Sequence, residues 1–143
     1  MSVYGKQNSD GSYGLPSTTL QDEGGFLTIN IPYVAGSVDN VHHVALRPYR
    51  VKAISGRVEV AGTDGGAVTS AIKKAASGTA ITAGTALHSG TFNLKGTAAT
   101  NQSLTLSTTD TDLSIAVGDS IGMDFTGTLT DASGVLTVLL APA

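Results

Sequence analysis

The sequence predicts an all-β fold, a jelly-roll-like β-sandwich that follows an extended N-terminal arm. From residue 25 onward, short runs rich in β-branched residues recur, and each ends at glycine or at a polar cluster. Several of these runs alternate apolar and polar residues with a period of two, and no helical runs alternate with them. A length of 143 residues suits one domain. A jelly roll is the commonest way to fold this many strands without closing a barrel.

Residues 1–24 form the predicted arm, and residues 25–143 form the predicted sandwich. The arm is mainly Gly, Ser, Asn, Asp and Gln, and its isolated apolar side chains are too few to offset the entropy of ordering. Such an arm is either frayed or docked on a partner. Four of its residues are candidate contacts to a partner: Tyr4, Lys6, Tyr13 and Leu15. The two tyrosines are large enough to act as anchors where a partner offers pockets.

The predicted strands follow one another through the rest of the chain. In order, the runs are "FLTINIPYV", "HHVALRPYRVKAISGRVEVA", "AVTSAIKKA", "HSGTFNL", "QSLTLS", "LSIAVGDSIGMDFTGTLT" and "GVLTVLLA". The period of two is clear where Val58 and Val60 alternate with Arg57 and Glu59. The stretch "VTSAIKKAASG" has some helical character, but its β-branched start favours a strand that follows a turn. We expect about seven to nine strands.

The glycine cluster "GTDGG" could cradle a phosphate, hold a cation or turn the chain. A phosphate loop needs a following helix and usually a lysine at P-loop spacing, and the sequence has neither. A calcium loop needs several oxygen ligands at alternate positions, whereas this one offers the Asp64 carboxylate and Thr63. Asp-Gly between two alternating apolar runs is a hairpin signal. We therefore assign Gly62, Asp64, Gly65 and Gly66 to a structural turn, as part of a hairpin.

The aspartates near the C-terminus are the other acidic candidates. Asp119 and Asp124 lie five positions apart, so one strand would point them to opposite faces unless a bulge intervenes. The loop with Asp110 and Asp112 is the best place for a metal ion, but turn positions explain Asp110, Asp119 and Asp131 equally simply. The sequence predicts no metal site.

The histidines and serines indicate no catalytic site. His42 and His43 are adjacent and diverge on a strand, while His88 has no metal-ligand spacing around it. All three are expected at the surface or in an interface. The chain has no cysteine, and no serine sits in a G-x-S-x-G elbow. We expect no catalytic residues, no cofactor and no enzyme activity.

The charge content limits the classes of partner. Only 13% of residues are charged and the net charge is −3, so no positive field attracts nucleic acid or an anionic membrane. A surface so poor in charge is usually covered in part by something else. The start of the chain has no apolar run of signal-peptide type, which predicts synthesis and retention in the cytoplasm of the producing cell. The last apolar run is far shorter than the ~20 residues of a membrane helix.

One small basic cluster stands out in this acidic chain. Arg47, Tyr49, Arg50, Lys52 and Arg57 fall close together. Arginine with tyrosine is typical of protein interfaces as well as of nucleic-acid patches, and the net negative charge favours protein. A solvated strand face is the simpler alternative. Arg47, Tyr49 and Arg50 are therefore candidate contacts to a protein partner.

Residues 49–143 resemble small structural proteins of tailed bacteriophages. The resemblance rests on "VAGTDGG", then "I-K-K" and "G-T-x-I-x-x-G", then "F-N-L-K-G-T", and then "L-x-x-x-x-x-D-L-x-I-A-V-G-D-x-I-G-M-D-F-T-G-T-L". These are turn and strand patterns. The resemblance implies a jelly-roll capsid decoration (cement) protein or head-fibre component, commonly trimeric. It also implies synthesis in the host cytoplasm, a place on the capsid exterior of the virion and the major capsid protein as partner.

Two other functions remain open from the sequence. A receptor- or carbohydrate-binding module of a head or tail fibre would need exposed aromatic side chains. The chain has no tryptophan, and its tyrosines all lie in the first third: Tyr4, Tyr13, Tyr33 and Tyr49. An adaptor or stopper at the portal is the third possibility, and its copy number per particle would be much lower than that of a decoration protein.

Overall fold

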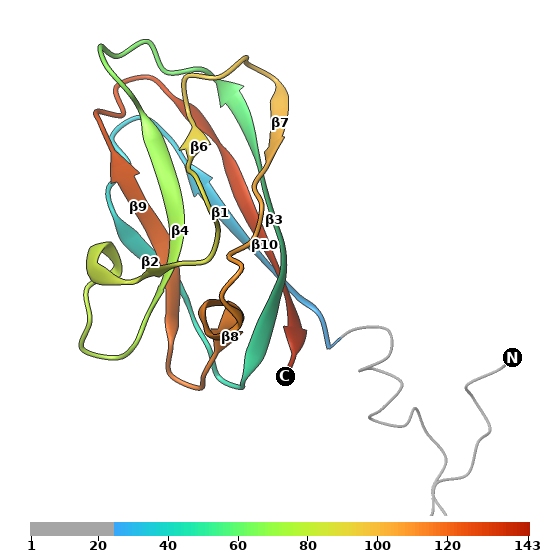
Figure 1. Ribbon diagram of the computed structural model, residues 1–143. Coiled ribbons are helices and arrows are strands. Elements are labelled where there is room, and N and C mark those ends of the chain that lie inside the picture. Colours follow the sequence, from blue (N-terminus) through green and yellow to red (C-terminus); the bar gives the residue numbers. More distant parts are fainter. Residues whose placement is uncertain (1–24) are drawn as a thin grey trace, which may run out of the picture.

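The structure is a computed structural model that describes residues 25–143 (Figure 1). The predicted arm, with Tyr4, Lys6, Tyr13 and Leu15, lies outside the described residues. No helix in the part of the chain that the structure describes is long and apolar enough to cross a membrane.

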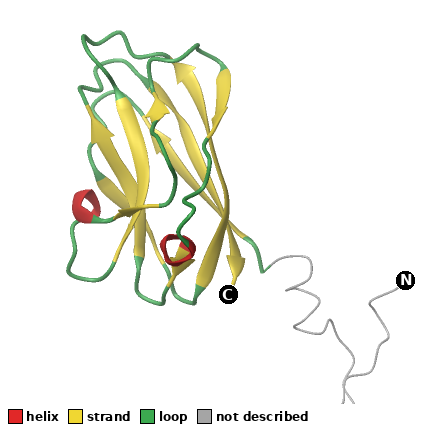
Figure 2. Ribbon diagram, in the orientation of Figure 1, coloured by secondary structure: helices red, strands yellow, loops and turns green. Residues whose placement is uncertain are grey.

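The described residues form ten strands and two short 3-10 helices. In chain order they are β1 (Leu27–Tyr33), β2 (Asn40–Val44), β3 (Tyr49–Val60), β4 (Thr69–Ala75), η1 (Ile81–Ala83), β5 (Thr85–Ala86), β6 (Phe92–Asn93), β7 (Thr100–Ser103), η2 (Asp110–Leu113), β8 (Ser114–Ile115), β9 (Ser120–Thr126) and β10 (Ser133–Pro142). The stretch "VTSAIKKAASG" supplies β4, so its assignment to a strand is confirmed. Figure 2 shows the strands side by side and most of the connecting loops gathered at the two ends of the molecule.

The strands pair in the order of a jelly roll. One sheet runs β1-β10-β3-β7, with β8 also on β3, and the other runs β2-β9-β4-β5, with β6 also on β4. All pairs are antiparallel, and one set of them nests: β1 with β10, β2 with β9, β3 with β7 and β8, and β4 with β5 and β6. The pairs of β10 with β3 and of β9 with β4 join these ribbons into the two sheets. This is the pairing of one long hairpin that has been folded over into two sheets. The predicted all-β, jelly-roll-like sandwich is therefore confirmed.

The core lies between the two sheets because the strands alternate as their sequences predict. On β1, Ile29, Ile31 and Tyr33 are buried, while Thr28 and Asn30 are exposed. The largest fully buried side chains come from both sheets and the connections: Tyr33, Phe92, Ile31, Ile72, Leu87, Leu94, Ile115, Ile121, Met123, Leu136, Leu140 and Val51. Each of these apart from Tyr33 contributes roughly 1.5–3 kcal/mol relative to an exposed position. These side chains hold the two sheets together without any disulfide.

Two core positions have unusual packing. Gly56 on β3 faces the interior where a side chain would have no room, because a Cβ there would overlap Leu136 Cδ2 and stand 3.1 Å from Phe92 Cε1. Tyr33 packs edge-on against Phe125, with 6.5 Å between ring centroids. Its buried hydroxyl has no hydrogen-bond partner among residues 25–143, and burial raises the pKa of Tyr33 to about 12.

The hairpin predicted at the glycine cluster is wrong. β3 and β4 flank it, but they lie in different sheets, so the chain crosses from one sheet to the other there. Gly66 has a φ of +78°, a left-handed conformation that glycine adopts without strain. The chain does turn at these glycines, but the turn connects strands of two different sheets and not two paired strands of a hairpin.

Candidate functional site

One end of the sandwich, which we call the base, brings together two loops that are distant in sequence. It is the end at which β1 begins and β10 ends, and the C-terminus lies there (Figure 1). The loop between β2 and β3 is tied to the loop between β8 and β9 through Ala45. The Ala45 N–H donates to Asp119 O and the Gly118 N–H donates to Ala45 O, both at 2.8 Å. These bonds fix the relative positions of the two loop tips.

The loop tips at the base carry exposed apolar side chains. Leu46 is 86% exposed and Val117 is 64% exposed. Beside Leu46, the Arg47 guanidinium lies over the Tyr49 ring, with 5.8 Å from Cζ to the ring centroid. We call Leu46, Arg47, Tyr49 and Val117 the base surface. Tyr49 is held at the start of β3 by pairing with Ile115 on one side and with the end of β10 on the other.

Residues 1–24 join the sandwich at this same end. Leu27, the first residue of β1, pairs with Leu140, two positions before Pro142, which pairs with Tyr49. The preceding residue, Phe26, is 57% exposed. The two segments that the sequence singled out as partner contacts are thus connected to the same end of the molecule.

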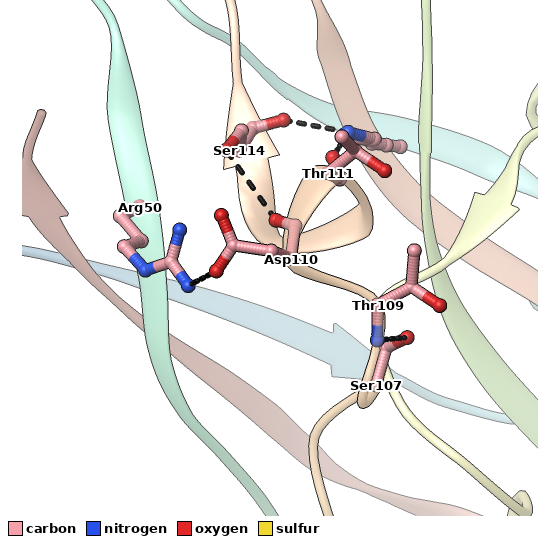
Figure 3. A network of polar contacts seen from close by, with 7 residues as sticks. Arg50, Ser107, Thr109, Asp110, Thr111 and Ser114 are labelled. Atoms are coloured by element: carbon pink, nitrogen blue, oxygen red, sulfur yellow. Dashed lines mark hydrogen bonds and ion pairs between the residues drawn. The ribbon is translucent and has the colours of Figure 1, made fainter.

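Arg50, the third predicted contact of the basic cluster, has a partner within the chain. Its Nη2 forms an ion pair with Asp110 Oδ1 at the start of η2 (Figure 3). The guanidinium holds the pKa of Asp110 below its ordinary value through this hydrogen bond and through its charge. Arg50 therefore positions η2, whereas Arg47 is in no ion pair with residues 25–143.

A lysine from the opposite sheet holds the other side of η2. Lys74 on β4 donates from Nζ to the carbonyl oxygens of Thr111 and Ser114, at 2.6 Å each. In Figure 3 the Ser114 hydroxyl also points back to the Asp110 carbonyl, 3.4 Å away. Because β4 and β8 belong to different sheets, these bonds close one side of the sandwich near the base.

The glycine cluster belongs to the opposite end, where it forms a crossed pair of contacts that we call the Thr–Asp clasp. The Asp64 carboxylate accepts hydrogen bonds from the Thr130 N–H, at 2.9 Å, and from the Thr130 hydroxyl. Reciprocally, Asp131 accepts from the Thr63 N–H, at 2.9 Å, and from the Thr63 hydroxyl, and these bonds lower the pKa of Asp131. Lys95 Nζ adds bonds to the Asp64 and Gly66 carbonyls at 2.5 and 3.0 Å. The cluster thus pins the β3–β4 loop to the β9–β10 loop.

The structure places His88 differently from the prediction. Its side chain is buried and not at the surface, because the ring packs between β4 and the Phe92 ring, with 5.5 Å between the two ring centroids. Its Nε2 accepts a hydrogen bond from the Ile72 N–H at 2.9 Å. Burial lowers the pKa of His88. His42 is exposed on β2, as expected, and His43 beside it is half-buried.

The aspartates considered for a metal site have separate structural contacts. Asp112 accepts from the Ser107 hydroxyl at 2.6 Å, Asp119 accepts from the Ala116 N–H at 2.9 Å, and Asp124 pairs with Lys73 at 2.6 Å. Across residues 25–143, no three His, Cys, Asp or Glu side chains lie close enough to hold a metal ion.

The base surface has the chemistry of a protein contact. Exposed leucine and valine supply apolar area, and arginine and tyrosine are residue types that are enriched in protein interfaces. Sequence reasoning found Arg47 and Tyr49 but missed Leu46 and Val117. The run "VALRPY" contained a signal for Leu46, an apolar side chain directly before an arginine and a proline, whereas nothing local linked Val117 to it.

Comparisons with known proteins add little to this description. No family model matches the sequence, and no significant match to a curated protein was found. A chain from the structure of Bacillus endospore appendages, described as a novel family of disulfide-linked pili, is 16% identical to this chain with a TM-score of 0.32. That match covers 82% of this chain and 88% of the other.

Proposed function

We propose that this protein is a capsid decoration (cement) protein of a tailed bacteriophage, which binds the major capsid protein on the outer surface of the assembled head. The proposal rests on the exposed side chains and the chain segment that lie together at the base. There the exposed Leu46 and Val117, the stacked Arg47 and Tyr49, and the attachment of residues 1–24 lie at one end of the sandwich. The sequence resemblance of residues 49–143 to phage structural proteins supplies the virion context.

The chemistry of the base surface suits a protein partner better than a sugar or a nucleic acid. Arg47 is in no ion pair with residues 25–143, so its donors can reach carboxylates or carbonyls of a partner. The apolar tips of Leu46 and Val117 gain about 25 cal/mol for each Å² that a partner covers. The two predicted tyrosine anchors in residues 1–24 would extend the contact along the shell.

Decoration requires no chemical reaction. A protein that binds only the assembled shell stabilises it at each site by RT ln(1 + [L]/Kd), so tight binding at many sites raises the melting temperature of the capsid. The resemblance also implies a homotrimer. Three base surfaces that face the shell together would bind with an avidity well above that of one copy.

Binding to capsids that lack the protein tests this function. Purified protein is mixed with such capsids, the capsids are pelleted, and the bound copies are counted. Leu46→Glu and Arg47→Ala should each reduce the bound fraction, because both side chains lie in the base surface. Val60→Glu is the matched control for Leu46→Glu, since Val60 is also an exposed apolar side chain (47%) but lies at the far end of β3.

A second variant tests the contribution of the arm. Deletion of residues 2–20 should weaken capsid binding, and unchanged binding would remove the arm from the proposed contact. Equal binding by the Leu46, Arg47 and Val60 variants would overturn the assignment of the base surface. Retention on host cells in place of capsids would support the receptor-binding alternative instead.

A further inference from the structure

The Thr–Asp clasp includes a chemically labile pair of residues, Asp64 and Gly65. An aspartate that precedes glycine can react with its own main chain, because glycine has no side chain to shield the amide nitrogen. The sequence contains this pair twice, at Asp64–Gly65 and at Asp10–Gly11, and the second pair lies outside the described residues. Gly65 is exposed, and nothing lies within 4 Å of its would-be Cβ. No other part of the sandwich crowds this position.

The reaction at such a pair is an intramolecular ring closure. The Gly65 nitrogen loses its proton and forms a bond to Asp64 Cγ, and one carboxyl oxygen leaves as water. Water then opens the resulting succinimide ring at either carbonyl. One product is aspartate again. The other is isoaspartate, in which the main chain runs through the former side chain and is longer by one methylene group.

The clasp opposes this reaction by holding both carboxyl oxygens of Asp64. The Thr130 N–H donates to Oδ2 at 2.9 Å, and the Thr130 hydroxyl donates to Oδ1. Hydrogen bonds of this kind stabilise the ionised carboxylate, whereas ring closure needs the neutral carboxyl group, from which water can leave. The main chain is held as well, because Lys95 Nζ donates to the Asp64 carbonyl oxygen at 2.5 Å. Rotation of the peptide toward Cγ would break this bond.

The other half of the clasp provides a comparison within the molecule. Asp131 accepts the matching pair of hydrogen bonds from the N–H and the hydroxyl of Thr63. Its next residue, however, is Ala132, which has a side chain and is fully buried. The two carboxylates are held alike, but only Asp64 is followed by an exposed residue without a side chain.

We propose that Asp64 is a site of isoaspartate formation and that Thr130 sets the rate by holding the carboxylate in the clasp. The Asp64 half of the clasp must open before the ring can close. Isoaspartate would then prevent it from closing again, because the lengthened main chain displaces the carboxylate from Thr130. Modified molecules would lose the bonds that pin the β3–β4 loop to the β9–β10 loop on this side. The proposal does not depend on what the base surface binds.

The test is the rate of isoaspartate formation in the full-length protein, incubated at neutral pH below its melting temperature. Digestion with trypsin releases Asp64 in the peptide 58–73 and Asp10 in the peptide 7–50. Chromatography separates the aspartate and isoaspartate forms of each peptide. The second peptide serves as the reference, because Asp10 precedes the same residue type and has no part in the clasp described here.

Thr130→Val removes the hydroxyl bond to Asp64 and keeps the backbone bond. The rate at Asp64 should rise about fivefold, the factor that corresponds to one hydrogen bond of ordinary strength. The rate at Asp10 should stay the same. Thr128→Val is the matched control, since it changes an exposed threonine of the same loop, and Gly56→Ala tests whether weaker core packing alone has the same effect.

Each outcome decides the proposal. A faster rate at Asp64 in the Thr130→Val variant, with the Thr128→Val and Gly56→Ala variants unchanged, supports it. Equal rates in the Thr130→Val variant and the unchanged protein overturn it. A rate at Asp64 in the folded protein that equals the rate in concentrated urea, where the clasp is absent, also overturns it. An equal rise in the Gly56→Ala variant would assign the reaction to general unfolding, with the same consequence.

Discussion

Asp64 and Thr130, which stand 66 positions apart, are joined by two hydrogen bonds from the backbone and the hydroxyl of the threonine to the carboxylate. Thr130→Val keeps the shape of the side chain and removes the hydroxyl bond, so it should lower the free energy of unfolding by about 1 kcal/mol. Asp64→Ala should cost more, because both bonds are lost. The measurement is urea denaturation.

The control for the clasp is Thr28→Val, at an exposed threonine in the middle of β1. A surface substitution there should change stability by no more than about 0.5 kcal/mol. Equal midpoints for the Thr130 and Thr28 variants would show that the clasp contributes nothing to the fold.

The buried His88 should make stability depend on pH. Its pKa is lowered by burial, so the unfolded chain binds a proton more readily than the folded one. The free energy of unfolding should therefore fall as the pH drops through the ordinary histidine value, from about pH 7 toward about pH 5. His88→Gln keeps an acceptor for the Ile72 N–H and should flatten this dependence.

His42→Gln is the control for His88. Burial also lowers the pKa of His42, but its side chain is exposed on β2, so its share of the pH dependence should be smaller. The carboxyl groups of Asp110 and Asp131 have lowered pKa values and lose their contribution only below their ordinary value of 3.8, outside this window. A full pH slope in the His88→Gln variant would show that His88 is not the source of the pH dependence.

Gly56 should not tolerate a side chain. Gly56→Ala would drive Cβ into Leu136 and crowd the Phe92 ring, and overpacking of this kind costs about 1–3 kcal/mol. Gly65→Ala is the matched control, since nothing lies within 4 Å of its would-be Cβ. It should be neutral or slightly stabilising. Thermal melting of the two variants checks the contrast, and equal melting temperatures would be inconsistent with the packing around Gly56.

Tyr33→Phe should stabilise the protein. The Tyr33 hydroxyl is buried without a partner among residues 25–143, and an unsatisfied buried polar group costs about 1–3 kcal/mol. The phenylalanine keeps the edge-on contact with Phe125. A higher urea midpoint is expected, whereas a lower one would mean that the hydroxyl has a partner in solution.

The sequence was sufficient to predict the fold class. The alternation of apolar and polar residues along β1 and β3 can be seen within each strand, without knowledge of which strands pair. It also placed Arg47 and Tyr49 in one cluster, because they lie two positions apart in the sequence. It could not predict contacts that depend on which strands become neighbours. The Asp-Gly signal identified a turn but not whether the next strand would pair with the previous one, and so the hairpin was wrong.

The same limit applies to the burial of His88 and to the base surface. His88 is buried because β4 runs beside it and offers the Ile72 N–H, a partner sixteen residues away. Val117 reaches the same end as Leu46 because Ala45 bonds to both Asp119 and Gly118 across the two loops. Neither contact has a signature in the residues next to it.

We propose that the base surface binds an assembled phage head. The most direct measurement counts the copies that pellet with capsids lacking the protein and records the melting temperature of the shell. Many copies per capsid are expected, in multiples of three, with a raised melting temperature of the shell. Leu46→Glu should reduce binding, and Val60→Glu should not. No binding, or a few copies confined to one vertex, would contradict it.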